Sequence, residues 1–125
     1  MEPSRVPADV DLVVLFGSRA QGSHHPDSDW DLGIRFHHKP EHPLRLYGVD
    51  AELAEAMGCS SDSLDVVDLD QASYLLQRVV AEQGQPLFER QPDLFASYCS
   101  KAIRQWADWE HRQEKLRRER KQMLA

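Results

Sequence analysis

The chain has 125 residues, of which 41% are hydrophobic and 29% are charged, the size and balance of one small globular domain. The apolar fraction is too high for a wholly disordered chain, and no run approaches the roughly 18 apolar residues that a membrane span needs. No apolar segment with a small-residue cleavage site follows the N-terminus, and Cys59 and Cys99 lack CxxC spacing. We therefore expect a cytoplasmic protein with two free thiols and no membrane association.

The formal net charge of -6 is unevenly distributed along the chain. Residues 1–100 hold 7 basic and 17 acidic side chains, a net of -10, whereas residues 101–125 hold 8 basic and 4 acidic side chains, a net of +4. An acidic body repels a phosphate backbone, so we expect no nucleic-acid binding outside the basic tail. The acidic side chains suit divalent cations.

The first half of the chain predicts two strands and a helix. Residues 10–16 form a nearly continuous apolar run, typical of a buried strand, and residues 30–36 alternate apolar and polar side chains, typical of a strand with one polar face. Between them we expect one helical turn over residues 18–21 and then a loop. Residues 44–57 predict an amphipathic helix closed by Gly58. The apolar side of that helix would consist of Leu44, Tyr47, Ala51, Ala54 and Met57.

The next segment predicts a third strand, a helix and an edge strand. Residues 64–69 read as the strand, and a helix from about residue 71 to 82 would be capped by Asp70 or Asp68. Its inner side would carry Leu75, Leu76, Val79 and Val80. Residues 86–89 predict a short edge strand, where a proline is tolerated.

The C-terminal residues predict a helix that is only partly docked. It would start at Pro92 and pack an apolar stripe that ends near Trp106. Beyond Glu110 almost no apolar residues remain, so we expect a domain of residues 1–110 and a charged helical tail of residues 111–125. The element order indicates the α/β (α+β) class, a small mixed sheet with helices packed on it.

Carboxylates on neighbouring predicted strands indicate a cation site. Asp29 and Asp31 are two residues apart, which on a strand places them on one side about 7 Å apart, within reach of a hard cation. A third carboxylate on an adjacent strand would complete an oxygen cage. Asp65 is our first choice because it lies between two apolar residues, and Asp68 is the second because it also fits a turn or a helix cap.

Gly17, Ser18 and Arg19 indicate phosphate binding next to that cation site. Glycine lets the main chain approach a ligand, N–H groups at a helix start attract anions, and Arg19 adds a cation for pyrophosphate oxygens. Together with the carboxylates, these residues fit nucleotidyl transfer, in which the protein acts mostly by positioning and electrostatic stabilisation.

This pattern resembles the nucleotidyltransferases of the DNA polymerase β superfamily, whose signature is Gly-Ser, about ten residues, and then Asp-x-Asp. Here Gly17-Ser18 is followed by ten residues and then by Asp29-Trp30-Asp31. The closer likeness is to the minimal nucleotidyltransferases, through GSRAQGSHHPDSDWDLGI and the later LDVVDL. The chain departs from many of these relatives at Gln21, where they carry a second arginine.

The resemblance implies a DNA polymerase β-like fold and a set of residue roles. Asp29 and Asp31 would bind Mg²⁺, and Asp65 would be a third metal ligand, a base for the incoming hydroxyl, or both. Another set of residues would hold the triphosphate of ATP: Gly17, Ser18 and Arg19.

The resemblance also implies a biological role. Minimal nucleotidyltransferases of this kind often act as the antitoxin of a bacterial toxin–antitoxin pair and transfer AMP from ATP to a tyrosine of a HEPN-type ribonuclease toxin. The chain has no separate domain to enclose a small acceptor, so we expect a partner protein to present the hydroxyl. The alternatives are a small-molecule or RNA-end nucleotidyltransferase and a catalytically silent binding antitoxin.

Other features have plainer interpretations. The pairs His24-His25 and His37-His38 lack zinc-site spacing, so we expect exposed loop histidines. For Trp109, at the edge of the terminal stripe, we weigh an interface anchor against core packing and favour core packing. The basic tail reads as a solvated helix end, with a partner or RNA as alternatives.

Overall fold

The computed structural model describes residues 1–23 and 25–125. Its strands are β1 (Val10–Phe16), β2 (Trp30–Phe36), β3 (Leu64–Asp68) and β4 (Gln85–Glu89). Its helices are α1 (Ser18–Gln21), α2 (Arg45–Met57), α3 (Tyr74–Gln83) and α4 (Leu94–Leu124), with short 3-10 helices η1 (Pro3–Arg5) and η2 (Ser61–Ser63). All the predicted strands are therefore present.

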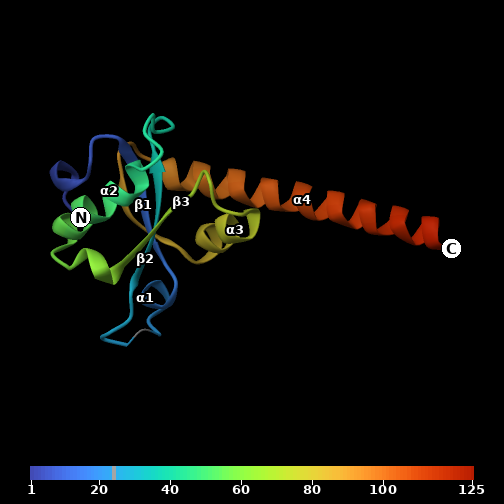
Figure 1. Ribbon diagram of the computed structural model, residues 1–125, viewed down its shortest axis with the longest axis horizontal. Coiled ribbons are helices and arrows are strands. Elements are labelled where there is room, and N and C mark those ends of the chain that lie inside the picture. The colour runs from blue at the N-terminus through green and yellow to red at the C-terminus, as the bar shows by residue number, and fades with distance from the viewer. Residues whose placement is uncertain (24) are drawn as a thin grey trace.

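The strands form one mixed sheet in the order β3-β2-β1-β4 (Figure 1). β1 pairs antiparallel with both β2 and β4, whereas β2 pairs parallel with β3. β4 lies at the edge, as Pro86 led us to expect. The predicted class, a small mixed sheet with packed helices, is confirmed.

Both faces of the sheet are covered, which explains the continuous apolar run of β1. Val13 and Leu15 belong to a core cluster that α2 completes, and Leu12 and Val14 belong to a second cluster that α3 and α4 complete. Successive side chains of a strand point to opposite faces, so residues 12–15, which are buried on both sides, are all apolar. Asp11, at the start of β1, is only partly buried.

The helix predicted over residues 44–57 is confirmed, but its predicted apolar side is right only in part: Ala54 is buried and Met57 packs on the core. Tyr47 is 74% exposed and Leu44 is 58% exposed, whereas Val49, Leu53 and Ala54 are buried. The predicted apolar side and the observed one both have spacings of three and four residues. The observed rotation buries the larger branched side chains and so removes more apolar surface from water.

The helix α3 begins at Tyr74, later than predicted, and neither aspartate caps it. The Ser73 hydroxyl caps the helix by accepting a hydrogen bond from the Leu76 N–H at 3.1 Å. The Asp68 carboxylate instead accepts from the Asp70 N–H at 3.0 Å. The Asp68 carboxylate therefore stabilises the turn that follows β3, a role that competes with capping.

One predicted inner residue of α3 faces outward. Leu75 is 55% exposed, whereas Val80 is buried and Leu76 packs against the α3–α4 core cluster. Consecutive residues on a helix are about 100° apart, and Leu75 lies outside the stripe of α3 that contains Leu76 and Val80.

The terminal helix α4 begins at Leu94 rather than at Pro92. Asp93 adopts a φ of 68°, and this left-handed residue separates Pro92 from the helix. The first half of α4 packs on the body, where Tyr98 and Ala102 are buried, and the second half projects away from it (Figure 1). No helix among the described residues has the length and apolarity that a bilayer crossing requires. Both cysteines are free, as predicted.

Candidate active site

Two of the predicted carboxylates lie side by side on neighbouring strands. Asp31 is the second residue of β2 and Asp65 is the second residue of β3, and the parallel register aligns them. Neighbouring strands run about 4.8 Å apart, and aligned residues of a parallel pair project from the same face. Asp29 lies one residue before β2 and is exposed.

The three carboxylates interact electrostatically. Burial raises the pKa of Asp31 above its ordinary value, and the negative charges of Asp65 and Asp29 raise it further. This concentration of negative charge costs free energy in the isolated protein. A cation bound between these carboxylates would remove that cost.

The main chain at Gly17 packs directly against the Asp31 carboxylate. A Cβ atom at residue 17 would overlap Asp31 Oδ2 and lie 3.1 Å from Asp31 Cγ. Gly17 also has φ 74° and ψ -156°, a region that essentially only glycine occupies. Glycine is therefore required here both for the backbone conformation and for the close approach to the carboxylate.

Arg19 holds the loop that precedes β2. Its guanidinium donates hydrogen bonds to the Ser28 carbonyl at 3.0 and 2.9 Å and to the Pro26 carbonyl at 3.3 Å. It also stacks over the Trp30 ring at 4.1 Å from the centroid. Ser28 and Trp30 are the residues on either side of Asp29, so Arg19 fixes the main chain that carries this carboxylate. Sequence reasoning gave Arg19 a phosphate role and missed this one.

Hydrogen bonds from side-chain amides connect the short helix α1 to α3 and to β4. Ser18 begins the helix and is partly buried. Gln21 donates a hydrogen bond to Gln83 on α3, and Gln85 on β4 donates to the Ala20 carbonyl at 2.7 Å. Gln21, the point of departure from many minimal nucleotidyltransferases, thus has a structural contact.

A fourth carboxylate near the site was not predicted. Asp50 is partly buried on α2; burial raises its pKa, and the negative charge of Asp65 adds to that rise. The sequence gave no signal for Asp50, because the predicted rotation of α2 did not bring this position toward β3.

The donor chemistry of the site fits Mg²⁺ without a preformed cage. Among residues 1–23 and 25–125, no three His, Cys, Asp or Glu side chains are grouped closely enough to hold a metal ion. Mg²⁺ is commonly bound by one or two carboxylates together with substrate phosphates and water. The aligned pair Asp31 and Asp65 suits such a shared site.

The predicted histidine pairs lie on the surface where the structure describes them. His25, His37 and His38 are exposed, as expected, and His24 lies outside the described residues. His37 Nδ1 lies 3.0 Å from Asp11 Oδ2.

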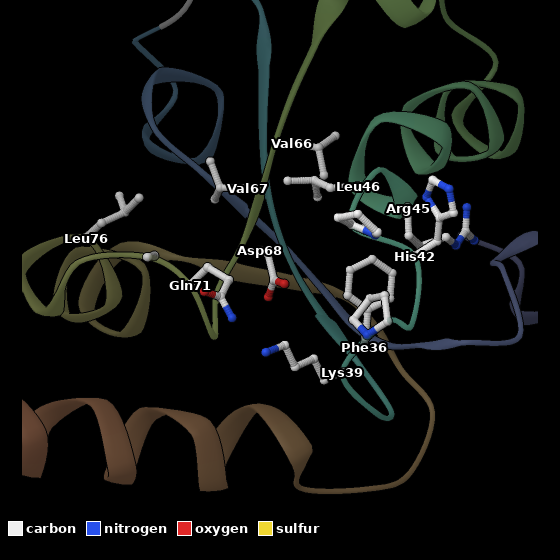
Figure 2. Close-up of a pocket in the computed structure, with 13 residues that line it drawn as sticks. Phe36, Lys39, His42, Arg45, Leu46, Val66, Val67, Asp68, Gln71 and Leu76 are labelled. Atoms are coloured by element: carbon white, nitrogen blue, oxygen red, sulfur yellow. The ribbon is translucent and has the colours of Figure 1, made fainter.

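A cavity of about 480 Å³ lies along the outer edge of β3. Figure 2 shows Leu46 and Val66 on one side of this strand and Val67 and Leu76 on the other. None of the predicted site residues lines the cavity, but Asp68 does. Burial raises the pKa of Asp68 above its ordinary value.

The register separates the two candidates for the third carboxylate. Asp65 is aligned with Asp31, whereas Asp68 is aligned with Ile34, farther along β2. The odd spacing between Asp65 and Asp68 also directs them to opposite faces of the sheet. Asp65 is therefore the residue that the fold brings beside Asp31.

A four-stranded mixed sheet with a Gly-Ser turn beside paired strand aspartates defines a nucleotidyltransferase core. The profile of the family described as "Polymerase beta, Nucleotidyltransferase" matches residues 5–93. The chain belongs to this family.

Curated relatives of the chain include two bacterial enzymes. It is 31% identical over 98 residues to the protein adenylyltransferase MntA of Aphanizomenon flos-aquae (strain 2012/KM1/D3). It is 37% identical over 90 residues to the protein adenylyltransferase MntA of Shewanella oneidensis (strain ATCC 700550 / JCM 31522 / CIP 106686 / LMG 19005 / NCIMB 14063 / MR-1). The alignments cover 74% and 70% of this chain but 65% and 61% of the relatives, so the chain spans less than two thirds of their length.

Solved structures of toxin–antitoxin complexes contain similar chains. A toxin–antitoxin crystal structure with AMP-PNP matches with a TM-score of 0.71 and 26% identity, over 90% of this chain and 87% of that chain. The MntA–HepT toxin–antitoxin structure matches with a TM-score of 0.63 and 23% identity, over 87% of this chain and 81% of that chain. These similarities confirm the polymerase β-like fold.

Proposed function

We propose that the chain is a protein adenylyltransferase that transfers AMP from ATP to a tyrosine hydroxyl of a HEPN-type ribonuclease toxin and thereby acts as its antitoxin. The observation that carries the proposal is the alignment of Asp31 with Asp65, with the Gly17 main chain against the Asp31 carboxylate. The similarity to the two MntA adenylyltransferases supports the choice of AMP and of a protein acceptor.

In the proposed reaction the acceptor oxygen attacks the α-phosphorus of ATP. The bond from that phosphorus to the oxygen bridging to the β-phosphate breaks, and pyrophosphate leaves. Asp65 accepts the hydroxyl proton, a role that suits an exposed carboxylate within reach of an incoming side chain. The Gly17 and Ser18 main chain holds the triphosphate.

The carboxylates Asp29, Asp31 and Asp65 would hold Mg²⁺, which would neutralise negative charge on the phosphates. Arg19 positions Asp29 through the Ser28 carbonyl, and its predicted contact with the triphosphate requires exchange of those hydrogen bonds. Cys59 and Cys99 are free thiols, which supports the cytoplasm as the compartment of this activity.

The site is open, which supports a protein acceptor. Asp65 and Asp29 are exposed and Asp31 is only partly buried. No predicted site residue lines the cavity beside β3. A large partner that covers this surface would exclude water from the reacting groups, which a small acceptor would not do.

The test incubates the purified chain with ATP labelled at the α-phosphate, Mg²⁺ and an extract of its source cells, followed by a denaturing gel. We expect one labelled protein, identified as the toxin by mass, and no label with the Asp29→Asn plus Asp31→Asn variant. The fold of the variant is checked by circular dichroism.

Two outcomes contradict the proposal. Labelling that persists with the double variant would show that these carboxylates are not the site. Label on RNA or on a small molecule, with none on protein, would establish the alternative transferase.

A further inference from the structure

The second half of α4 has no partner in the described structure. The helix continues past the end of α3 and projects from the body (Figure 1). Residues 111–125 hold 6 basic and 2 acidic side chains, which gives this segment a net charge of +4. Its described ion pairs are local, from Glu114 to Arg117 and Arg118. Such exposed pairs stabilise a helix only weakly.

An apolar line on this helix continues the face that is docked on α3. Ala102, Trp109, Leu116 and Met123 follow one another at intervals of seven residues. Ala102 is 1% exposed in the core, whereas Leu116 is 44% exposed and Met123 is 84% exposed. Helices that pack along one another carry apolar residues at two positions in every seven, and this line supplies one of the two. We call Trp109, Leu116 and Met123 the α4 seam.

The seam begins at a hollow between α3 and α4. A cavity of about 550 Å³ is lined there by apolar and polar side chains, which include Tyr74, Leu75, Trp106, Trp109, Asp70, Ser73 and Gln77. The two tryptophan rings lie 5.1 Å apart, and Leu75 is 55% exposed. Aromatic side chains in such hollows supply much of the affinity of protein interfaces. The hollow and the seam meet at Trp109, and polar residues such as Arg112 and Gln113 lie between Trp109 and Leu116.

Basic side chains flank the seam. At about 100° per residue, Arg112 and Arg120 lie within about 40° of Leu116, on either side of it. This charge favours an acidic partner. A second copy of the chain would bring two segments of net charge +4 together, which opposes pairing. The net charge of -10 on residues 1–100 repels the RNA backbone, and RNA has no apolar side chains to cover the seam.

We propose that the α4 seam and the hollow at its base dock an acidic amphipathic helix of the toxin partner. This inference rests on the proposed function for the identity of the partner. Docking on α4 holds the toxin without using the catalytic carboxylates, so binding and AMP transfer depend on separate surfaces of this chain.

Two double variants with the same change in net charge test the proposal. Arg112→Glu plus Arg120→Glu reverses the charges beside the seam. Arg118→Glu plus Lys121→Glu reverses charges about 140–160° away from Leu116. Leu116→Gln removes the central apolar contact, and because Leu116 lies outside the body we expect no effect on the fold.

Each variant is made in the full chain that also carries Asp29→Asn and Asp31→Asn, so that no transfer occurs. The probe is the purified HEPN-type toxin of the same cells, titrated calorimetrically at about 0.15 M salt, where exposed charges act over about 8 Å. We expect the seam-flanking double variant to weaken binding by about 30-fold and Leu116→Gln by about tenfold. The Arg118→Glu plus Lys121→Glu variant, whose charges lie away from the seam, should change the affinity less than about threefold.

Several outcomes would overturn the docking surface. These are equal losses for the two double variants, no loss for either, no binding of the toxin, and a dimer of this chain that Leu116→Gln dissociates. AMP transfer by the chain without substitutions is measured in parallel. If the seam substitutions weaken toxin binding as expected but no AMP is transferred, the proposed function alone is refuted. If AMP is transferred but the seam substitutions leave toxin binding unchanged, the docking surface alone is refuted.

Discussion

Replacement of Gly17 by alanine tests the contact between the Gly17 main chain and the Asp31 carboxylate. The new Cβ would overlap Asp31 Oδ2 and lie 3.1 Å from Asp31 Cγ. At φ 74° and ψ -156° the backbone itself costs a residue other than glycine about 1–3 kcal/mol. The carboxylate must also move, by a distance on the order of 1 Å. A misplacement of that size in a catalytic site costs about 100-fold in rate.

We therefore expect Gly17→Ala to lower the free energy of unfolding in urea by about 1–3 kcal/mol and the rate of AMP transfer by about 100-fold. The matched control is Gly22→Ala. Gly22 has a similar φ of 75°, but nothing lies within 4 Å of a Cβ placed there. The control should lose about 1 kcal/mol of stability and keep its rate. Equal rates for the two variants would refute the reasoning.

Two further predictions concern charge. Hydrogen bonds from Arg45, at 2.7 and 2.9 Å, lower the pKa of Asp9, so this pair stabilises the fold above the ordinary pKa and the stabilisation is lost as the pH falls below about 4. Asp9→Asn should cost less than about 1 kcal/mol in urea at neutral pH, because the pair is partly exposed. This cost should shrink as the pH falls below the ordinary pKa, and a cost that does not change in acid would contradict the reasoning. Asp31→Asn removes a negative charge beside Asp65, so calorimetry should show tighter ATP binding than the unsubstituted chain without Mg²⁺ and weaker binding with it, by about fivefold each way. A change in ATP affinity that has the same sign with and without Mg²⁺ would show that Asp31 does not hold the cation.

Local pattern was sufficient wherever the residues that end an element are themselves distinctive. β1 ends at Phe16 before Gly17, and α1 ends at Gln21 before Gly22, as predicted. The apolar neighbours of Asp65 led us to choose it over Asp68, and the strand register aligns Asp65 with Asp31.

Rotation of a helix about its axis and the path of a loop could not be predicted. In α2 two stripes have the same spacing, and only packing on the sheet selects the one with Val49 and Leu53. That rotation also places Asp50 near Asp65. The hydrogen bonds from Arg19 to the Ser28 carbonyl depend on the course of the intervening loop, which no periodicity encodes.

The distribution of charge is consistent with both proposals, a cation-dependent reaction on the body and a docking surface on α4. The clustered carboxylates that suit a cation also make the body acidic, and an acidic body repels ATP, and any acidic partner, until a cation is bound. A basic surface placed next to these carboxylates would pair with them and compete with the cation. On the projecting half of α4 the same positive charge lies away from the strands that carry Asp31 and Asp65 (Figure 1). If the acceptor docks on α4 as proposed, the positive charge there would attract it without neutralising the carboxylates of the site.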